Sequence, residues 1–182
     1  RAIALAAARA GASVVLAART GDQLREAARE AESLGGRALA VEADVRRRDD
    51  VERLVAAAVA ANGGLDAVVS NAGVFVWKPL EALAEEEWDL VLGTNLKAAY
   101  LLVRAALPEL KKSRGTVLNV ASIHGTAGDA NVVAHCAAKF GLVGFTKALA
   151  LELRPHGVSV NALCPGSTDN RKPCPMPAKH SI

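Results

Sequence analysis

The chain has 182 residues, and its 22 Lys and Arg residues outnumber its 19 Asp and Glu residues, which gives a formal net charge of +3. A hydrophobic share of 51% excludes a disordered chain, because such chains lack the aliphatic residues that build a core. Charges of both signs are interspersed, so no nucleic-acid partner is expected, and the one basic run, at residues 46–48, predicts a solvated loop.

Helical and extended patterns alternate along the sequence. Residues 21–34 predict a helix, because Leu24, Ala28 and Ala31 share one face and two glycines follow. The extended runs are short and almost wholly apolar, as in parallel strands buried on both faces. In chain order, the sequence predicts a helix at 1–10, a strand at 13–19, a helix at 21–34, a strand at 37–45, a helix at 49–61, a strand at 65–70, a helix at 85–112, a strand at 116–121, a helix at 132–154 and a strand at 158–163.

This order is typical of right-handed βαβ units and predicts an α/β fold with a Rossmann-like, doubly wound parallel sheet. No strand and no Gly-rich phosphate-binding turn precede the helix at 1–10, so we expect the sheet to lack its first strand. Residues 1–169 would form one incomplete domain. Residues 170–182 predict a Pro-rich tail without a core, so the last strand of the sheet is also expected to be missing.

Membrane and metal sites are not predicted. No apolar stretch approaches the roughly 18 residues of a membrane span, and Arg9 interrupts the only run resembling a signal peptide. The three cysteines, Cys136, Cys164 and Cys174, are scattered without metal-ligand spacing and predict reduced thiols. We therefore expect a cytoplasmic protein with no membrane partner and no metal.

Polar and small residues follow the predicted strands, where doubly wound sheets bind their ligands. They are Arg19, Asp44, Asn71, Ala72, Gly73, Ser122, Pro165 and Gly166. Asn95 lies inside a helical pattern, where an Asn side chain competes for backbone hydrogen bonds and kinks the helix. Lys139 lies on an apolar helical face, from which it would either extend to water or point into a cleft and lower a neighbour's pKa.

Several separated strings, in order, resemble the short-chain dehydrogenase/reductase family of the ordinary type over residues 1–169. They include Ser70-Asn71-Ala72-Gly73, Thr94-Asn95, Asn119-Val120-Ala121-Ser122, Ala137-Ala138-Lys139 and Val160-Asn161-Ala162-Leu163-Cys164-Pro165-Gly166. The resemblance implies a dinucleotide-binding domain, a nicotinamide cofactor and hydride exchange between an alcohol and a carbonyl, as in 3-oxoacyl reductases. Its substrate would be a small-molecule alcohol or carbonyl compound.

The resemblance also assigns roles to residues. Ser122 would hydrogen-bond the substrate oxygen, Asn95 would position a water in a proton relay, and Lys139 would hold the nicotinamide ribose and lower the pKa of the acid/base. Asp44 would contact the adenine, and Pro165 and Gly166 would lie along the nicotinamide. The expected cofactor-binding set is completed by Val45, Asn71, Ala72 and Gly73.

Arg19 bears on the choice of cofactor. Dehydrogenases that prefer NAD usually carry an acidic residue at the end of this strand, which accepts hydrogen bonds from the ribose hydroxyls. A guanidinium instead suits a 2′-phosphate by charge and by its forked donors. The sequence therefore favours NADP over NAD, unless Arg19 only faces solvent.

His135 stands where the family has its acid/base tyrosine, four residues before Lys139 and 13 after Ser122. Imidazole is a common acid/base, but its outer nitrogen stops about 2 Å short of a tyrosine oxygen, and a misplacement of about 1 Å costs roughly a hundredfold in rate. The positive charge of Lys139 would also favour a neutral ring, which is a poor proton donor.

Two functions remain open at this point. In the first, the chain is a fragment of a longer oxidoreductase, with chemistry that His135 slows. In the second, it is a catalytically silent dinucleotide-fold partner, scaffold or decayed fragment. The two long helices, at 85–112 and 132–154, carry small and apolar residues, so a homodimer or homotetramer is expected.

Overall fold

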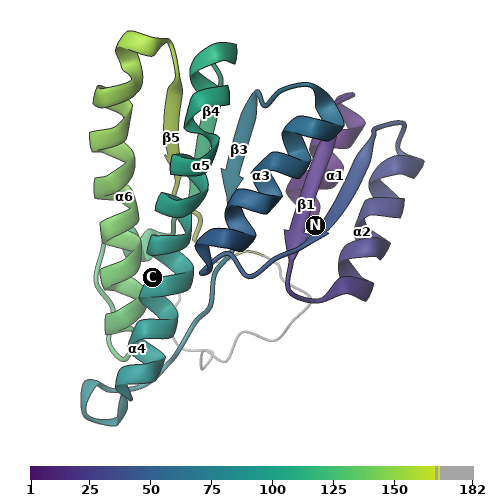
Figure 1. Ribbon diagram of the computed structural model, residues 1–182. Coiled ribbons are helices and arrows are strands. Elements are labelled where there is room, and N and C mark those ends of the chain that lie inside the picture. Colours follow the sequence, from purple (N-terminus) through teal and green to yellow (C-terminus); the bar gives the residue numbers. More distant parts are fainter. Residues whose placement is uncertain (167, 169–182) are drawn as a thin grey trace. The chain divides into compact units, whose positions relative to one another are not determined.

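The computed structural model describes residues 1–166 and residue 168 (Figure 1). They form two compact units. The first contains Arg1–Val68, Tyr100–Thr116 and His156–Val158, and the second contains Val69–Ala99, Val117–Pro155 and the chain from Ser159 onward. The predicted tail at 170–182, including Cys174, lies outside the described residues.

The first unit is built around two parallel strands. Its main elements are α1 (Ala2–Arg9), β1 (Val14–Ala18), α2 (Gly21–Ser33), β2 (Ala38–Glu42), α3 (Arg48–Asn62) and most of α5 (Ala98–Ser113). The strands β1 and β2 pair in register from Val14 with Ala38 to Ala18 with Glu42. Leu5 and Ala8 of α1 pack with Ala31 of α2, so the apolar stripe predicted for 21–34 is the face that this helix buries.

Glycines end the helices of this unit where the sequence predicts. Gly35, with φ of +89°, follows α2, and Gly63, with φ of +75°, caps α3 in the left-handed conformation. Residues with a Cβ rarely adopt this conformation, so a glycine there both stops the helix and permits the turn into the next strand.

The second unit holds a three-stranded sheet and its connecting helices. Its strands are β3 (Ala67–Ser70), β4 (Thr116–Val120) and β5 (Ser159–Leu163), in the order β3-β4-β5. The connections contain η1 (Leu80–Ala82), α4 (Glu85–Leu92), η2 (Gly93–Lys97), η3 (Ile123–Gly125), α6 (Val133–Leu153) and η4 (Arg154–His156). Figure 1 shows α6 running alongside β5, with which it packs.

Two apolar clusters fix α6 within the second unit. Ala134 and Ala138, near its start, pack with Val91 of α4. Leu142, one turn later, packs with Ala99 and with Ala121 at the end of β4. The small residues of α6 therefore bring its backbone close to the carboxyl end of the sheet.

The Rossmann-like α/β fold predicted from the sequence is confirmed, and all predicted strands and helices are present. One element differs: the helix predicted at 85–112 consists of α4, the π-helical turn η2 and α5. Asn95 lies within η2, so the helix is irregular at this residue, while the kink itself stays a prediction.

The sequence predicts no segment long and apolar enough to span a membrane, and this prediction was wrong for one helix, judged by its length and composition alone. Glu85–Ser113 forms 29 residues of continuous helix that are apolar enough to meet that criterion. However, Asn95 is only 2% exposed, and Ala99 and Leu110 are fully buried. Core helices of soluble proteins have the same character, and we interpret the segment as one of them.

Gly36 tests the packing of α1. A Cβ at this position would lie 3.0 Å from the Ala8 Cβ and 3.1 Å from the Ala12 carbonyl oxygen, whereas a Cβ at Gly64 meets nothing within 4 Å. We expect Gly36→Ala to lower the free energy of unfolding by about 1–3 kcal/mol, because the backbone of α1 must move. Gly64→Ala should change it by less than about 0.5 kcal/mol. Urea unfolding measures both, and equal effects would refute this packing.

Candidate active site

Ser122 lies at the carboxyl end of β4, where the chain turns into η3. Its Oγ accepts a hydrogen bond of 3.2 Å from the backbone N–H of His124. The neighbouring Ile123 N–H donates to the Pro165 carbonyl at 2.9 Å. Strand pairing therefore brings two predicted site segments together, the end of β4 and the Pro165-Gly166 segment that follows β5.

The turn η3 is pressed against α6. A Cβ at Gly125 would lie 2.8 Å from the backbone carbonyl oxygen of Lys139, so only glycine permits this approach. A buried polar pair strengthens the same contact, because the Asn119 amide of β4 donates to the Thr146 hydroxyl of α6 at 2.9 Å. Ser122 and the first turns of α6 consequently share one rigid part of the second unit.

Asn95 is held from two sides by one residue. Its Oδ1 accepts from the backbone N–H of Val74 at 2.8 Å, and its Nδ2 donates to the Val74 carbonyl at 2.9 Å. A Cβ at Gly73 would lie only 3.4 Å from Oδ1, so the small residues predicted at 71–73 allow the loop to approach Asn95. The predicted role with a water stays a prediction, whereas the contact with the loop at 71–74 was not foreseen.

The amide of Asn95 also determines the tautomer of His135. Its Nδ2 lies 3.3 Å from His135 Nδ1, and because an amide nitrogen only donates, this contact is a hydrogen bond in the tautomer that carries its proton on Nε2. The ring is further enclosed by Phe75, with ring centroids 4.9 Å apart, and by His124, with centroids 5.6 Å apart. Both neighbouring rings meet it edge to face.

The charge state of His135 follows from this setting. Burial lowers the pKa of the ring from 6.5 to about 4, with the positive charges of Lys139 and His124 acting in the same direction and the Val74 carbonyl opposing them. The sequence-based expectation of a neutral imidazole beside Lys139 agrees with this direction. Near neutral pH, His135 is therefore a hydrogen-bond donor at Nε2 and not an imidazolium acid.

Lys139 points inward from α6 and does not extend to water. It is 5% exposed, and its Nζ donates to the Val120 carbonyl, at the end of β4, at 2.7 Å. Burial lowers its pKa from 10.5 to about 8, with Cys164 opposing the shift. One ammonium N–H is engaged by Val120, which leaves two donors for a ligand.

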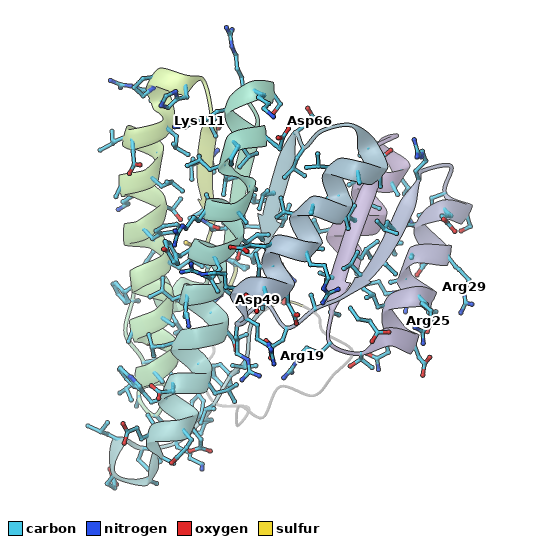
Figure 2. The ribbon with its side chains drawn as sticks, in the orientation of Figure 1. Arg19, Arg25, Arg29, Asp49, Asp66 and Lys111 are labelled. Carbon is cyan, nitrogen blue, oxygen red and sulfur yellow. The ribbon has the colours of Figure 1, made fainter. Side chains whose placement is uncertain are left out.

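Arg19, Asp44 and Val45 belong to the first unit. Arg19 follows β1 directly and is exposed (Figure 2). The Asp44 carboxylate accepts from Arg46 Nε at 3.0 Å, and this hydrogen bond, with a smaller contribution from the charge of Arg19, lowers the pKa of Asp44 to about 2. Arg46 therefore pairs with Asp44 while staying 38% exposed, and Arg47 and Arg48 are exposed, but the predicted loop was wrong at Arg48, where α3 begins.

Three residues at the site were not singled out as site residues from the sequence. His124 lies against His135, Asp129 Oδ2 lies 3.5 Å from His124 Nε2, and Phe75 covers the other edge of His135. A histidine two residues after the Ser122 at the strand end was the available signal for His124. Cys136 and Cys164 are free thiols, as predicted. The electrostatic effect of Cys164 raises the pKa of Lys139 and so opposes the effect of burial.

Known proteins resemble this chain in sequence and in fold. D-beta-hydroxybutyrate dehydrogenase of Rhizobium meliloti is 36% identical over 168 residues, which cover 91% of this chain but 65% of that protein. A 3-oxoacyl-(acyl-carrier-protein) reductase FabG of Staphylococcus epidermidis is 33% identical, covering 91% of this chain and 69% of that protein.

A metagenomic short-chain oxidoreductase solved in complex with NADP superposes with a TM-score of 0.84 at 37% identity, over 90% of this chain and 76% of the other. Residues 1–173 match the family described as short chain dehydrogenase. The chain therefore belongs to the short chain dehydrogenase family.

Proposed function

We propose that this chain carries the site of an NADP-dependent oxidoreductase that exchanges a hydride between a nicotinamide and a small alcohol or carbonyl compound. The proposal is supported by three contacts within the second unit: Asn95 lies against His135, Lys139 donates to Val120 at the end of β4, and Ser122 follows that strand end. The oxidoreductase names of the relatives support it, and a 3-oxoacyl-reductase-like or hydroxyacyl substrate fits those names.

The side chains fit a nicotinamide dinucleotide by their donor chemistry. Lys139 keeps two N–H donors for ribose hydroxyls, and the carboxylate of Asp44, kept ionised by Arg46, accepts from an adenine amine. The segments at Asn71-Ala72-Gly73 and Pro165-Gly166, together with Val45, would pack against the cofactor. When bound, the nicotinamide supplies the hydride acceptor or donor that no side chain provides.

Arg19 supports NADP over NAD. It is an exposed guanidinium immediately after β1, and its charge reaches Asp44. No carboxylate stands at this strand end to accept from the ribose hydroxyls of NAD. A doubly charged 2′-phosphate would gain forked, charge-assisted hydrogen bonds from Arg19.

Ser122 and His135 would both address the substrate oxygen as donors. The Ser122 oxygen already accepts from the His124 N–H, so its own proton is directed elsewhere. His135 presents Nε2–H, because Asn95 occupies Nδ1. Two donors stabilise the oxygen's developing negative charge, but accepting its proton at Nε2 requires His135 to change tautomer and to give up the hydrogen bond from Asn95. We therefore expect slow turnover.

The same observation supports a second candidate, a catalytically silent dinucleotide-binding partner. A neutral ring locked as the Nε2–H tautomer would bind a carbonyl without completing proton transfer. The exposed Phe140 and Leu151 of α6 provide apolar surface for a second copy of the chain, and a homodimer or homotetramer in the cytoplasm accords with either function.

His135→Tyr separates the two candidates. A phenol would reach further than the imidazole and have its pKa lowered by Lys139, so we expect NADPH-dependent reduction of ketones to rise at least about 100-fold. Turnover on a ketone panel, followed by NADPH absorbance, measures this. NADPH binding without turnover in either protein would favour the silent partner, and the absence of binding would contradict both candidates.

Arg19→Ala tests the cofactor preference. We expect the Kd for NADPH to rise by roughly 10-fold or more, because a hydrogen bond to a charged group contributes about 1.5–3 kcal/mol, while the Kd for NADH stays unchanged. Arg29→Ala, at an exposed position on α2 (Figure 2), is the matched control and should change neither. Calorimetric titration measures both, and a parallel loss of NADH affinity would refute the assignment.

The neutral state of His135 has a consequence for stability. Its pKa is about 4 in the folded chain against an ordinary 6.5, so between these pH values the unfolded chain binds more protons and stability falls as the pH falls. Solvent screens this partly exposed ring, and we expect a loss of about 1–2 kcal/mol.

Urea unfolding at pH 7.5 and pH 4.5 should show that loss in the original chain but not in His135→Gln. His156→Gln, at an exposed position in the first unit, should behave like the original chain. Equal losses in all three proteins would show that His135 is not held neutral.

A further inference from the structure

A second imidazole lies beside His135. The rings of His124 and His135 are 5.6 Å apart between centroids and nearly perpendicular, at 86°. His124 Nε2 also lies 3.5 Å from Asp129 Oδ2. Neither His124 nor Asp129 has a role in the function proposed above.

The structure holds both members of this pair in place. The side chain of His124 is 14% exposed and that of Asp129 is 24% exposed. His124 is fixed through its backbone N–H to Ser122 and through the close approach of Gly125 to α6. Asp129 is fixed by its other oxygen, Oδ1, which accepts from the Ala130 N–H at 2.7 Å. Such fixed partners lose little side-chain entropy when they interact.

We propose that His124 and Asp129 form a charge-holding dyad, which holds the site's proton on His124 and leaves His135 as a neutral hydrogen-bond donor. The inference deepens the proposed function and rests on it for its catalytic meaning. The arrangement of the rings, however, stands without that function.

The surrounding charges favour this distribution of the proton. His124 faces the carboxylate of Asp129, whereas His135 faces the ammonium of Lys139 on its own helix and the ring of His124 from η3. Cys164, which directly follows β5, faces Lys139, and Glu87 of α4 is paired with Lys78 at 2.6 Å. Two adjacent imidazoles resist double protonation, so the proton goes to the ring with the anionic partner.

A proton held on His124 would matter for the substrate oxygen. His124 is bonded through its backbone to Ser122, and its ring lies beside that of His135, so a fixed positive charge there would favour the anionic form of an oxygen that these two residues address. His124 would thus be a positioning residue that acts through His135 and through its electric field. A ring that only packed against His135 would make no such contribution.

Imidazole NMR on the full chain, labelled with ¹⁵N and ¹³C histidine, tests the inference without cofactor or substrate. His156→Gln and His124→Gln assign the signals. As the pH falls we expect His124 to take up its proton before His135, and His135 to remain the Nε2–H tautomer down to about pH 5. Protonation of His135 first would overturn the proposal.

Substitutions of Asp129 provide the decisive readout. Asp129→Asn should make His124 harder to protonate, because it removes an opposite charge within 4 Å, and Asp129→Glu should restore part of that effect. His124→Gln should raise the pH at which His135 protonates. Unchanged titrations in a folded Asp129→Asn chain, as judged by its amide spectrum, would show that His124 only packs.

The result of the histidine titrations does not depend on whether the proposed oxidoreductase function is correct. Should NADPH fail to bind while the two histidines titrate as stated, the dyad stands and the proposed function fails. Should NADPH bind and turn over while the titrations are insensitive to Asp129, the proposed function stands and the dyad fails.

Discussion

The hydrogen bonds between the Asn95 amide and the backbone of Val74 hold the site together. A side-chain amide has only two donors and one acceptor group, and Val74 uses the acceptor and one donor. The remaining donor is directed at His135. The π-helical turn η2 places Asn95 where it reaches both partners, and the small residue Gly73 admits the loop. One buried side chain therefore sets the loop position, the helix geometry and the tautomer of the imidazole.

Burial acts in the same direction on two titratable groups of the site, but with different results. It lowers the pKa of Lys139 to about 8, so the amine remains mostly protonated near neutral pH. It lowers the pKa of His135 to about 4, so the imidazole is neutral at the same pH. The Val120 carbonyl accepts a hydrogen bond from the ammonium of Lys139. A charged donor and a neutral donor thus sit within one turn of the same helix, a division of charge states typical of catalytic sites.

The sequence predicted the elements well because their signals are local. Strand runs and helical periodicity located β1 to β5 and α1 to α6, and the expected kink at Asn95 followed from the competition of an Asn side chain with backbone hydrogen bonds. The failures concern contacts between distant residues. The ring of Phe75 against His135 leaves no trace in periodicity. His124 is adjacent to a predicted site residue in sequence, but its approach to His135 depends on Gly125 packing against α6.

A histidine at position 135 changes what its neighbours must supply. A phenol both donates and, once ionised, accepts at one oxygen, whereas an imidazole divides these functions between two nitrogens. In this chain the inner nitrogen is already occupied by Asn95, which leaves the outer nitrogen as a donor. Any proton that leaves the substrate must then find another base or force a change of tautomer. The imidazole of His124 lies beside this ring with its own carboxylate, and when it holds a proton it acts on His135 through its charge and not as that base.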